Sequence, residues 1–206
     1  MQLIVISHPD TVAHEARLIN QLFEAGLTRF HLRKPDWNEK QVVDLLRQID
    51  QVFHPYIALH QHHRIAPDCN IKRLHYTEKH RQTTEQNKLI LQKEEGFVLS
   101  TSIHDTTDLS LLTPFDYTFF GPVFNSISKP GYQSNLIEAF HINRNDIQPK
   151  IIALGGVKRS NLDKLKLMGF DGAAVLGTIW NDPVQAITNF NILQEHLSNT
   201  HQQPTL

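Results

Sequence analysis

The sequence predicts a single (β/α)₈ barrel, and three observations support this fold class. Short apolar runs alternate with longer amphipathic stretches along the chain, which is the pattern of the strand and helix units that build a parallel sheet. There are eight such apolar runs, the number of strands in this barrel. The first run is followed by Ser7-His8-Pro9-Asp10, so it lacks the G-x-G-x-x-G turn of an open dinucleotide-binding sheet.

Each predicted strand is a short apolar run bounded by polar residues or turn formers. In chain order the eight predicted strands cover residues 2–6, 30–33, 56–60, 73–75, 97–102, 117–120, 151–154 and 172–176. The helices are predicted from apolar spacing and from their end signals. They cover residues 11–25 with Gly26 as the stop, 38–51 with an asparagine cap, 160–168 closed by Gly169, and 183–196 opened by a proline.

Length, charge and cysteine content limit the class of protein. A chain of 206 residues with 40% hydrophobic content suits one domain with one core, and residues 198–206 form a polar tail that we expect to be frayed. The net charge of −1 gives no overall attraction to nucleic acid or to an anionic membrane. The start, MQLIVISHPD, resembles neither a signal peptide nor a membrane span, and Cys69 is the lone cysteine. We therefore expect a cytoplasmic protein that binds neither nucleic acid nor membrane.

Histidines are numerous, and His60, Gln61, His62 and His63 form their densest group. A zinc site needs ligands that share a face, whereas neighbouring residues on a strand point to opposite sides. We therefore interpret His62 and His63 as part of a polar loop and not as metal ligands.

Two glycine turns near the end of the chain predict a phosphate site. Leu154-Gly155-Gly156 ends the seventh predicted strand, and Val175-Leu176-Gly177 ends the eighth. Glycines at these positions let backbone N–H groups approach phosphate oxygens at the C-terminal end of a barrel.

Polar residues follow three other predicted strands and are expected at the same end of the barrel. A glycine-bounded loop after the sixth strand carries Ser126, Ser128 and Lys129, which could hold a diphosphate and neutralise a leaving group. The second strand ends in His31-Leu32-Arg33-Lys34, of which one cation should face the barrel mouth, and the fifth ends near Ser102 and His104.

Taken together, these motifs resemble the thiamine phosphate synthase superfamily, which also contains thiazole tautomerases. Arg33-Lys34 resembles the family's R-x-K, Ser102-Ile103-His104 its S-x-H, and residues 121–129 its G-P-[IV]-[FY]-P-T-x-T-K loop. The two glycine turns resemble the family's phosphate-holding turns, and all five motifs occur in the family's order.

The resemblance implies an enzyme of thiamine biosynthesis that joins hydroxymethylpyrimidine diphosphate to thiazole phosphate and releases pyrophosphate. In that case Arg33, Lys34 and Lys129 would stabilise the departing charge, and Ser102, Ser126 and Ser128 would donate to phosphate oxygens. His60 and His104 would line the substrate pocket, while Gly155, Gly156, Val175, Leu176 and Gly177 would hold the thiazole phosphate. The partners are these two small molecules, and a homodimer is left open.

The sequence also departs from the family's pattern. The synthases hold Mg²⁺ with two aspartates, but His60-Gln61 stands in place of Asn-Asp, and His75-Tyr76-Thr77-Glu78-Lys79-His80 in place of H-L-G-Q-E-D. Both expected carboxylates are absent, and Glu78 is the candidate replacement ligand. A tautomerase needs no metal, but Pro122 stands where that branch often has histidine. We favour the synthase, with the tautomerase and a non-catalytic binder of thiazole phosphate or thiamine phosphate as alternatives.

Overall fold

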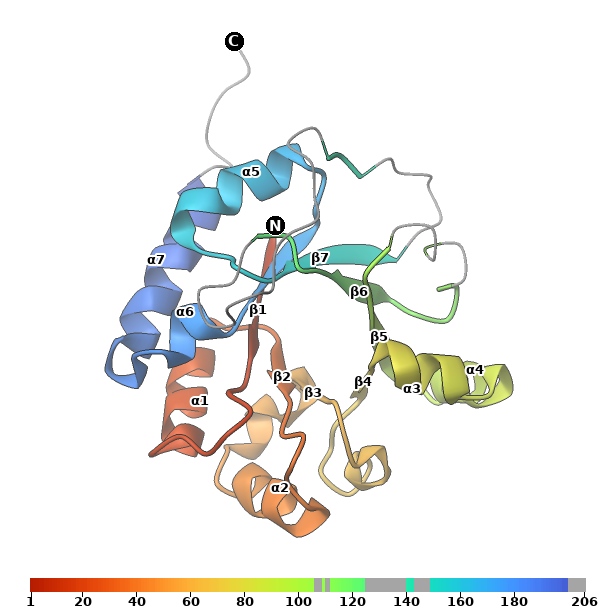
Figure 1. Ribbon diagram of the computed structural model, residues 1–206. Helices are drawn as coiled ribbons and strands as arrows, with labels where there is room; N and C mark the ends of the chain where they lie inside the picture. The colour runs from red at the N-terminus through yellow and green to blue at the C-terminus, as the bar shows by residue number, and fades with distance from the viewer. Residues whose placement is uncertain (106–108, 110–111, 125–139, 143–148, 200–206) are drawn as a thin grey trace.

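The computed structural model describes residues 1–105, 109, 112–124, 140–142 and 149–199. Within them, eight parallel strands close into a barrel in chain order, with β8 pairing back onto β1. Figure 1 shows the strands at the centre of the molecule and the helices around them. The predicted (β/α)₈ barrel is confirmed.

The strands agree with the predicted runs to within one residue at each end. They are β1 (Gln2–Ile6), β2 (Phe30–Leu32), β3 (Ile57–Leu59), β4 (Arg73–Tyr76), β5 (Val98–Ile103), β6 (Tyr117–Phe120), β7 (Lys150–Leu154) and β8 (Gly172–Val175). The agreement follows from local sequence, because each run is apolar, short and bounded by polar or turn residues.

The helices agree with the predictions less closely. The α-helices are α1 (Glu15–Glu24), α2 (Glu39–Leu46), α3 (Glu78–Thr83), α4 (Gln86–Glu94), α5 (Leu162–Leu167), α6 (Gly177–Trp180) and α7 (Ala186–Asn199). Short 3₁₀ helices cover Gln51–Tyr56, His63–Ile65, Arg159–Asn161 and Pro183–Gln185. No described helix is long and apolar enough to cross a membrane.

Differences from the predicted helices have local causes. Helix α1 begins at Glu15 and not at residue 11, because His14 has the left-handed φ of 55° just before it. Helix α2 begins as expected, with Asn38 accepting from the Gln41 amide in a capping box. Helices α3 and α4 were not predicted, since α3 buries no residue and α4 buries only Leu89, so neither has an apolar stripe.

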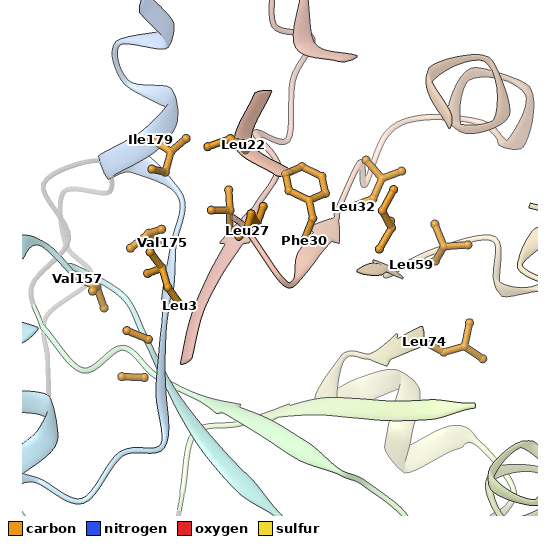
Figure 2. Packing of buried hydrophobic residues seen from close by; sticks show 14 of the residues in the cluster. Leu3, Leu22, Leu27, Phe30, Leu32, Leu59, Leu74, Val157, Val175 and Ile179 are labelled. Atoms are coloured by element: carbon orange, nitrogen blue, oxygen red, sulfur yellow. The ribbon is translucent and has the colours of Figure 1, made fainter. Parts of the chain in front are cut away.

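The core has two parts, which follow from the alternation of side chains along each strand. Leu3 and Val5 pack outward beneath the helices, whereas Ile4 and Ile6 face the barrel interior. Figure 2 shows the outer layer, in which Leu22 and Ile179 from the surrounding helices lie over strand residues such as Phe30. The inner apolar cluster is made by β1, β6, β7 and β8, and consists of Ile4, Ile6, Tyr117, Phe119, Ile152 and Ala174.

Candidate functional site

A pocket of about 360 Å³ opens where strands β4 to β7 end. It lies at the C-terminal end of the barrel, the end at which enzymes of this fold build their active sites. The residues that line it are Thr77, Glu78, Lys79, Ser102, Ile103, His104, Phe119, Gly121 and Leu154. Of the predicted site residues, the pocket therefore brings Ser102, His104 and Glu78 together.

The glycine turn after β7 is built for a close approach of backbone to backbone. Gly155 and Gly156 have φ values of 100° and 63°, a region that favours glycine. A Cβ on Gly155 would lie 3.0 Å from the Cα of Pro122, and one on Gly121 would lie 2.3 Å from the carbonyl oxygen of Leu154. The loop after β6 is bound to this turn as well, since the Phe124 amide donates to the Gly155 carbonyl at 3.1 Å.

The second predicted turn lies beside the first. Val175 ends β8, and Gly177 begins the short helix α6, so the amides of Gly177 and Thr178 lie in a first helical turn without partners inside the helix. The Thr178 hydroxyl donates to the Val157 carbonyl at 2.6 Å, which joins the two turns. Their backbone amides thus lie on neighbouring loops, an arrangement suited to an oxyanion.

His104 and Glu78 form a pair at the edge of the pocket. Nδ1 of His104 is 2.6 Å from a carboxylate oxygen of Glu78, and Arg81 approaches the other oxygen at 4.0 Å. The imidazole is half-exposed, whereas the carboxylate is partly buried. A histidine oriented by a carboxylate can accept and donate protons, so this pair is a candidate acid–base group.

The two adjacent cations after β2 differ in position. Lys34 is fully buried, and its ammonium lies 2.7 Å from a Glu15 carboxylate oxygen and 2.8 Å from the Asp10 carbonyl. Burial lowers the pKa of Lys34 and raises the pKa of Glu15, and the contact between them opposes both shifts. Lys34 is thus tied to α1 and Arg33 is partly exposed, and neither of them is among the residues that line the pocket.

The alternation of side chains explains this difference. Leu32 belongs to the outer core and His31 to the barrel interior, so Arg33 continues on the inner side and Lys34 on the outer side. The backbone of Arg33 is held by Ser7, whose hydroxyl accepts from the Arg33 amide at 2.8 Å.

Three histidines from neighbouring strands meet inside the barrel, and the sequence analysis did not predict that meeting. Nδ1 of His31 is 2.9 Å from Nε2 of His60, and Nε2 of His31 is 2.7 Å from the Tyr117 hydroxyl. His75 lies against His60 with ring centroids 4.0 Å apart. Polar residues on the inward side of β2, β3 and β4 were the signal that could have revealed this cluster.

The three imidazoles are neutral. Burial, with smaller contributions from neighbouring cations and histidines, holds the pKa values of His31 and His60 well below the ordinary value. The same causes lower the pKa of His75 to about 3. The rings of His62 and His63 bond to backbone carbonyl oxygens, of Trp37 for His62 and of Leu59 and His75 for His63.

Comparison with known proteins identifies the family. The family model described as thiamine monophosphate synthase matches residues 1–179 of this chain. The chain belongs to this family. Among its relatives in the thiamine monophosphate synthase family, the thiamine-phosphate synthase of Clostridium tetani (strain Massachusetts / E88) is 25% identical over 166 residues, 79% of each chain. That of Lysinibacillus sphaericus (strain C3-41) is 25% identical over 191 residues, 87% of this chain and 88% of the relative.

Solved structures of the thiamine monophosphate synthase family have the same barrel. The thiamine phosphate pyrophosphorylase from Bacteroides thetaiotaomicron superposes with a TM-score of 0.76 at 25% identity, over 98% of this chain and 100% of that one. The enzyme of the same name from Pyrococcus furiosus has a TM-score of 0.77 at 15% identity and 96% coverage of both chains, which supports the fold alone. The resemblance noted in the sequence is confirmed at the level of family and fold.

The described residues do not fit the Mg²⁺ site expected for a synthase of this family. Gln61, at one of the two aspartate positions, accepts from the Lys34 amide at 3.2 Å, and His80, at the other, lies 5.4 Å from His63 between ring centroids. Glu78 is the one carboxylate among the pocket-lining residues, and it pairs with His104. Mg²⁺ prefers several hard oxygen ligands, and this set offers a single carboxylate already engaged.

The loop residues Ser126, Ser128 and Lys129 lie outside the described residues, so their predicted roles stay predictions. His60, predicted to line the pocket, is instead nearly buried in the histidine cluster below it.

Proposed function

We propose that this chain is a thiamine phosphate synthase-like enzyme, which joins hydroxymethylpyrimidine diphosphate to thiazole phosphate and releases pyrophosphate. The observation that carries the proposal is the pair of linked glycine turns beside a 360 Å³ pocket, in a chain of this family. The relatives named thiamine-phosphate synthase support the same assignment.

In this proposal different groups of the protein bind each of the two substrates. The amides around Gly155, Gly156 and Gly177 hold the thiazole phosphate. Ser102, which lines the pocket, donates to a phosphate oxygen, and Arg33 and Lys129 neutralise the departing pyrophosphate. Ser126 and Ser128 are assigned to the diphosphate on their resemblance to the family's loop.

The proposed reaction is a substitution at the exocyclic methylene of the pyrimidine. The C–O bond to the diphosphate breaks with both electrons leaving on pyrophosphate, and the lone pair of the thiazole nitrogen forms the new C–N bond. Cationic and hydrogen-bonding side chains lower the barrier because negative charge accumulates on the leaving oxygen. In this proposal Arg33 and Ser102 contribute to this stabilisation, and Ser126, Ser128 and Lys129 are assigned to it by their resemblance to the family's loop.

The experiment is an incubation of the protein with both substrates, with Mg²⁺ or with EDTA, followed by fluorescence detection of thiamine phosphate after oxidation. Arg33→Met should reduce the rate strongly, while Arg47→Met, just after helix α2, should not, because Arg47 is exposed and pairs with Asp44 on the surface. Product formed at equal rates by the Arg33 variant and the parent would contradict the assigned role of Arg33. The absence of product in every condition would contradict the synthase assignment.

A thiazole tautomerase is the second candidate, and the His104–Glu78 pair favours it because a tautomerase moves a proton and needs no metal. Incubation of the thiazole phosphate substrate in deuterated water distinguishes the two. Deuterium incorporation without thiamine phosphate formation, lost in His104→Gln, would select the tautomerase. Binding without incorporation would select a non-catalytic binder.

A further inference from the structure

Two arginines lie at the N-terminal end of the barrel, opposite the pocket. Arg29 directly precedes β2, and Arg73 is the first residue of β4. Both side chains are directed into the barrel, because the next residue on each strand, Phe30 or Leu74, packs in the outer core. Both arginines are half-buried, so solvent can reach them at this end. We call Arg29 and Arg73 the basal arginine pair.

The layered packing of the barrel interior brings the pair together. In this fold, alternate strands supply the side chains of one interior layer. His31, His75 and Phe119 on β2, β4 and β6 form such a layer, with ring centroids 4.7 to 5.4 Å apart. The basal arginine pair and Tyr117 stand two residues earlier on the same strands, so they form the next layer toward the N-terminal end.

The contacts and charges of this layer agree with the placement. The guanidinium carbon of Arg29 lies 4.6 Å from the centroid of the Tyr117 ring. Burial lowers the pKa of Arg73, and the positive charge of Arg29 lowers it further. Both arginines oppose the rise that burial causes in the pKa of Tyr117. The two guanidiniums and the Tyr117 ring are therefore close neighbours.

The basal arginine pair has no acidic partner in the described part of the chain. Neither guanidinium is within salt-bridge distance of a described carboxylate. Asp116 and Asp171 precede β6 and β8 and lie one position before an inward residue, so they belong to the outer side. Asp116 pairs with Lys93 and also accepts from a β5 amide at 2.8 Å. Asp171 accepts from the Ile151 amide at 2.6 Å.

The hydrogen-bonding groups of the two guanidiniums are largely unused. Arg29 lies over the Tyr117 ring, and its buried Nε has no hydrogen-bond partner among the described residues. Arg73 donates from Nε to the Pro55 carbonyl at 2.8 Å, which leaves its terminal nitrogens for a further acceptor. A guanidinium packed on an aromatic ring keeps its planar fork of N–H groups for a carboxylate or a phosphate.

A third cation stands at the same end of the barrel. Lys150 begins β7 and is exposed, and it lies on the inward side because Ile152, two residues later, belongs to the interior cluster. Three positive charges thus converge on the N-terminal mouth of the barrel, and together they attract an anion to it.

We propose that the basal arginine pair binds a phosphate-class oxyanion, as a second anion site separate from the glycine turns after β7 and β8. The oxyanion lies between the two guanidiniums and accepts from their terminal N–H groups. Its charge offsets the repulsion between the two cations, so its binding stabilises the folded protein. The site is at the opposite end of the barrel from the proposed active site, and its test does not depend on turnover.

The test is a ¹H–¹⁵N spectrum of the arginine Nε–H groups, recorded during a titration with inorganic phosphate. Signals are assigned from the variants Arg29→Lys and Arg73→Lys. The expected result is that the signals of Arg29 and Arg73 shift along one common saturating curve. Signals that do not move, or that follow two different dissociation constants, would overturn a shared site.

Arg73→Met tests whether one anion contacts both arginines. The Kd for phosphate measured at the Arg29 signal should rise at least about tenfold, since hydrogen bonds from a charged group are lost. Arg17→Met is the matched control, because it removes the same charge from an exposed position on α1. An unchanged Kd at Arg29 in Arg73→Met would overturn the proposal. The wild-type titration remains a separate test if this variant does not fold.

Gly155→Ala separates the two phosphate sites. Gly155 follows β7 at the other end of the barrel, so the response of Arg29 and Arg73 to phosphate should be unchanged in this variant. Loss of the response would show that the arginines report on the glycine turns, and would contradict a second site.

Free phosphate and phosphate monoesters share the chemistry that the arginines recognise, so glycerol 3-phosphate is the second probe. A response of Arg29 and Arg73 to both probes would support a site for any phosphate group. A response to inorganic phosphate alone would support a site for the free ion.

Discussion

Nδ1 of His31 lies 2.9 Å from Nε2 of His60, and both rings are enclosed in a barrel whose other half is apolar. This contact joins residues 29 positions apart in the chain and brings two neutral imidazoles to hydrogen-bond distance. Its consequences for stability, and those of the other buried polar contacts, can be measured.

Stability should fall as the pH drops below about 6.5, the ordinary pKa of an unfolded histidine. His31, His60 and His75 stay neutral when folded, whereas the unfolded chain binds a proton at each of them. Each such histidine costs up to about 1.4 kcal/mol of unfolding free energy per pH unit, down to its own folded pKa. Urea unfolding at pH 7.5, 6.5, 5.5 and 5.0 measures this slope, and a flat profile between 6.5 and 5.0 would contradict buried neutral histidines.

Removing one member of the Lys34–Glu15 pair should destabilise the protein by about 3–5 kcal/mol, since the remaining charge would be buried without its partner. Lys34→Met alone tests this by urea unfolding. The double variant Lys34→Met with Glu15→Leu should lose much less unfolding free energy, because no buried charge remains. Lys40→Met, which breaks an exposed pair with Asp44, is the control and should change stability little.

Gly155→Ala should weaken both stability and phosphate binding. The φ of 100° disfavours any side chain, and the new Cβ would press on Pro122 at 3.0 Å. Gly96→Ala is a matched control, since Gly96 has a φ of 83° but nothing within 4 Å of an added Cβ. Calorimetric titration with thiazole phosphate should show weaker binding only for the Gly155 variant. Equal affinities in both variants would contradict a role of this turn in phosphate binding.

Removal of divalent cations with EDTA should leave the affinity for thiazole phosphate unchanged. The turns after β7 and β8 present backbone amides, and the pocket lining holds a single carboxylate, so thiazole phosphate should bind equally well in EDTA and in Mg²⁺. The measurement is a binding titration in each condition without the second substrate. A large gain in affinity with Mg²⁺ would show that ligands outside this lining complete a metal site.

The motifs that lie along short stretches of chain were predictable. Eight apolar runs determined the strands, and the glycine turns after β7 and β8 were identified from their sequences. After β7 the backbone needs glycine, because Gly155 and Gly156 have positive φ values. Helices α3 and α4 escaped prediction because they bury almost nothing and so carry no apolar stripe.

The sequence by itself determined the barrel, its family and the position of the two glycine turns, because each depends on local apolar pattern or local backbone geometry. Only the tertiary structure decided that Lys34 is buried in a pair with Glu15. It also decided that His31 meets Tyr117, 86 residues away in the chain. Such contacts depend on strand register and barrel closure, which set the neighbours of an inward side chain and which no short stretch of sequence contains.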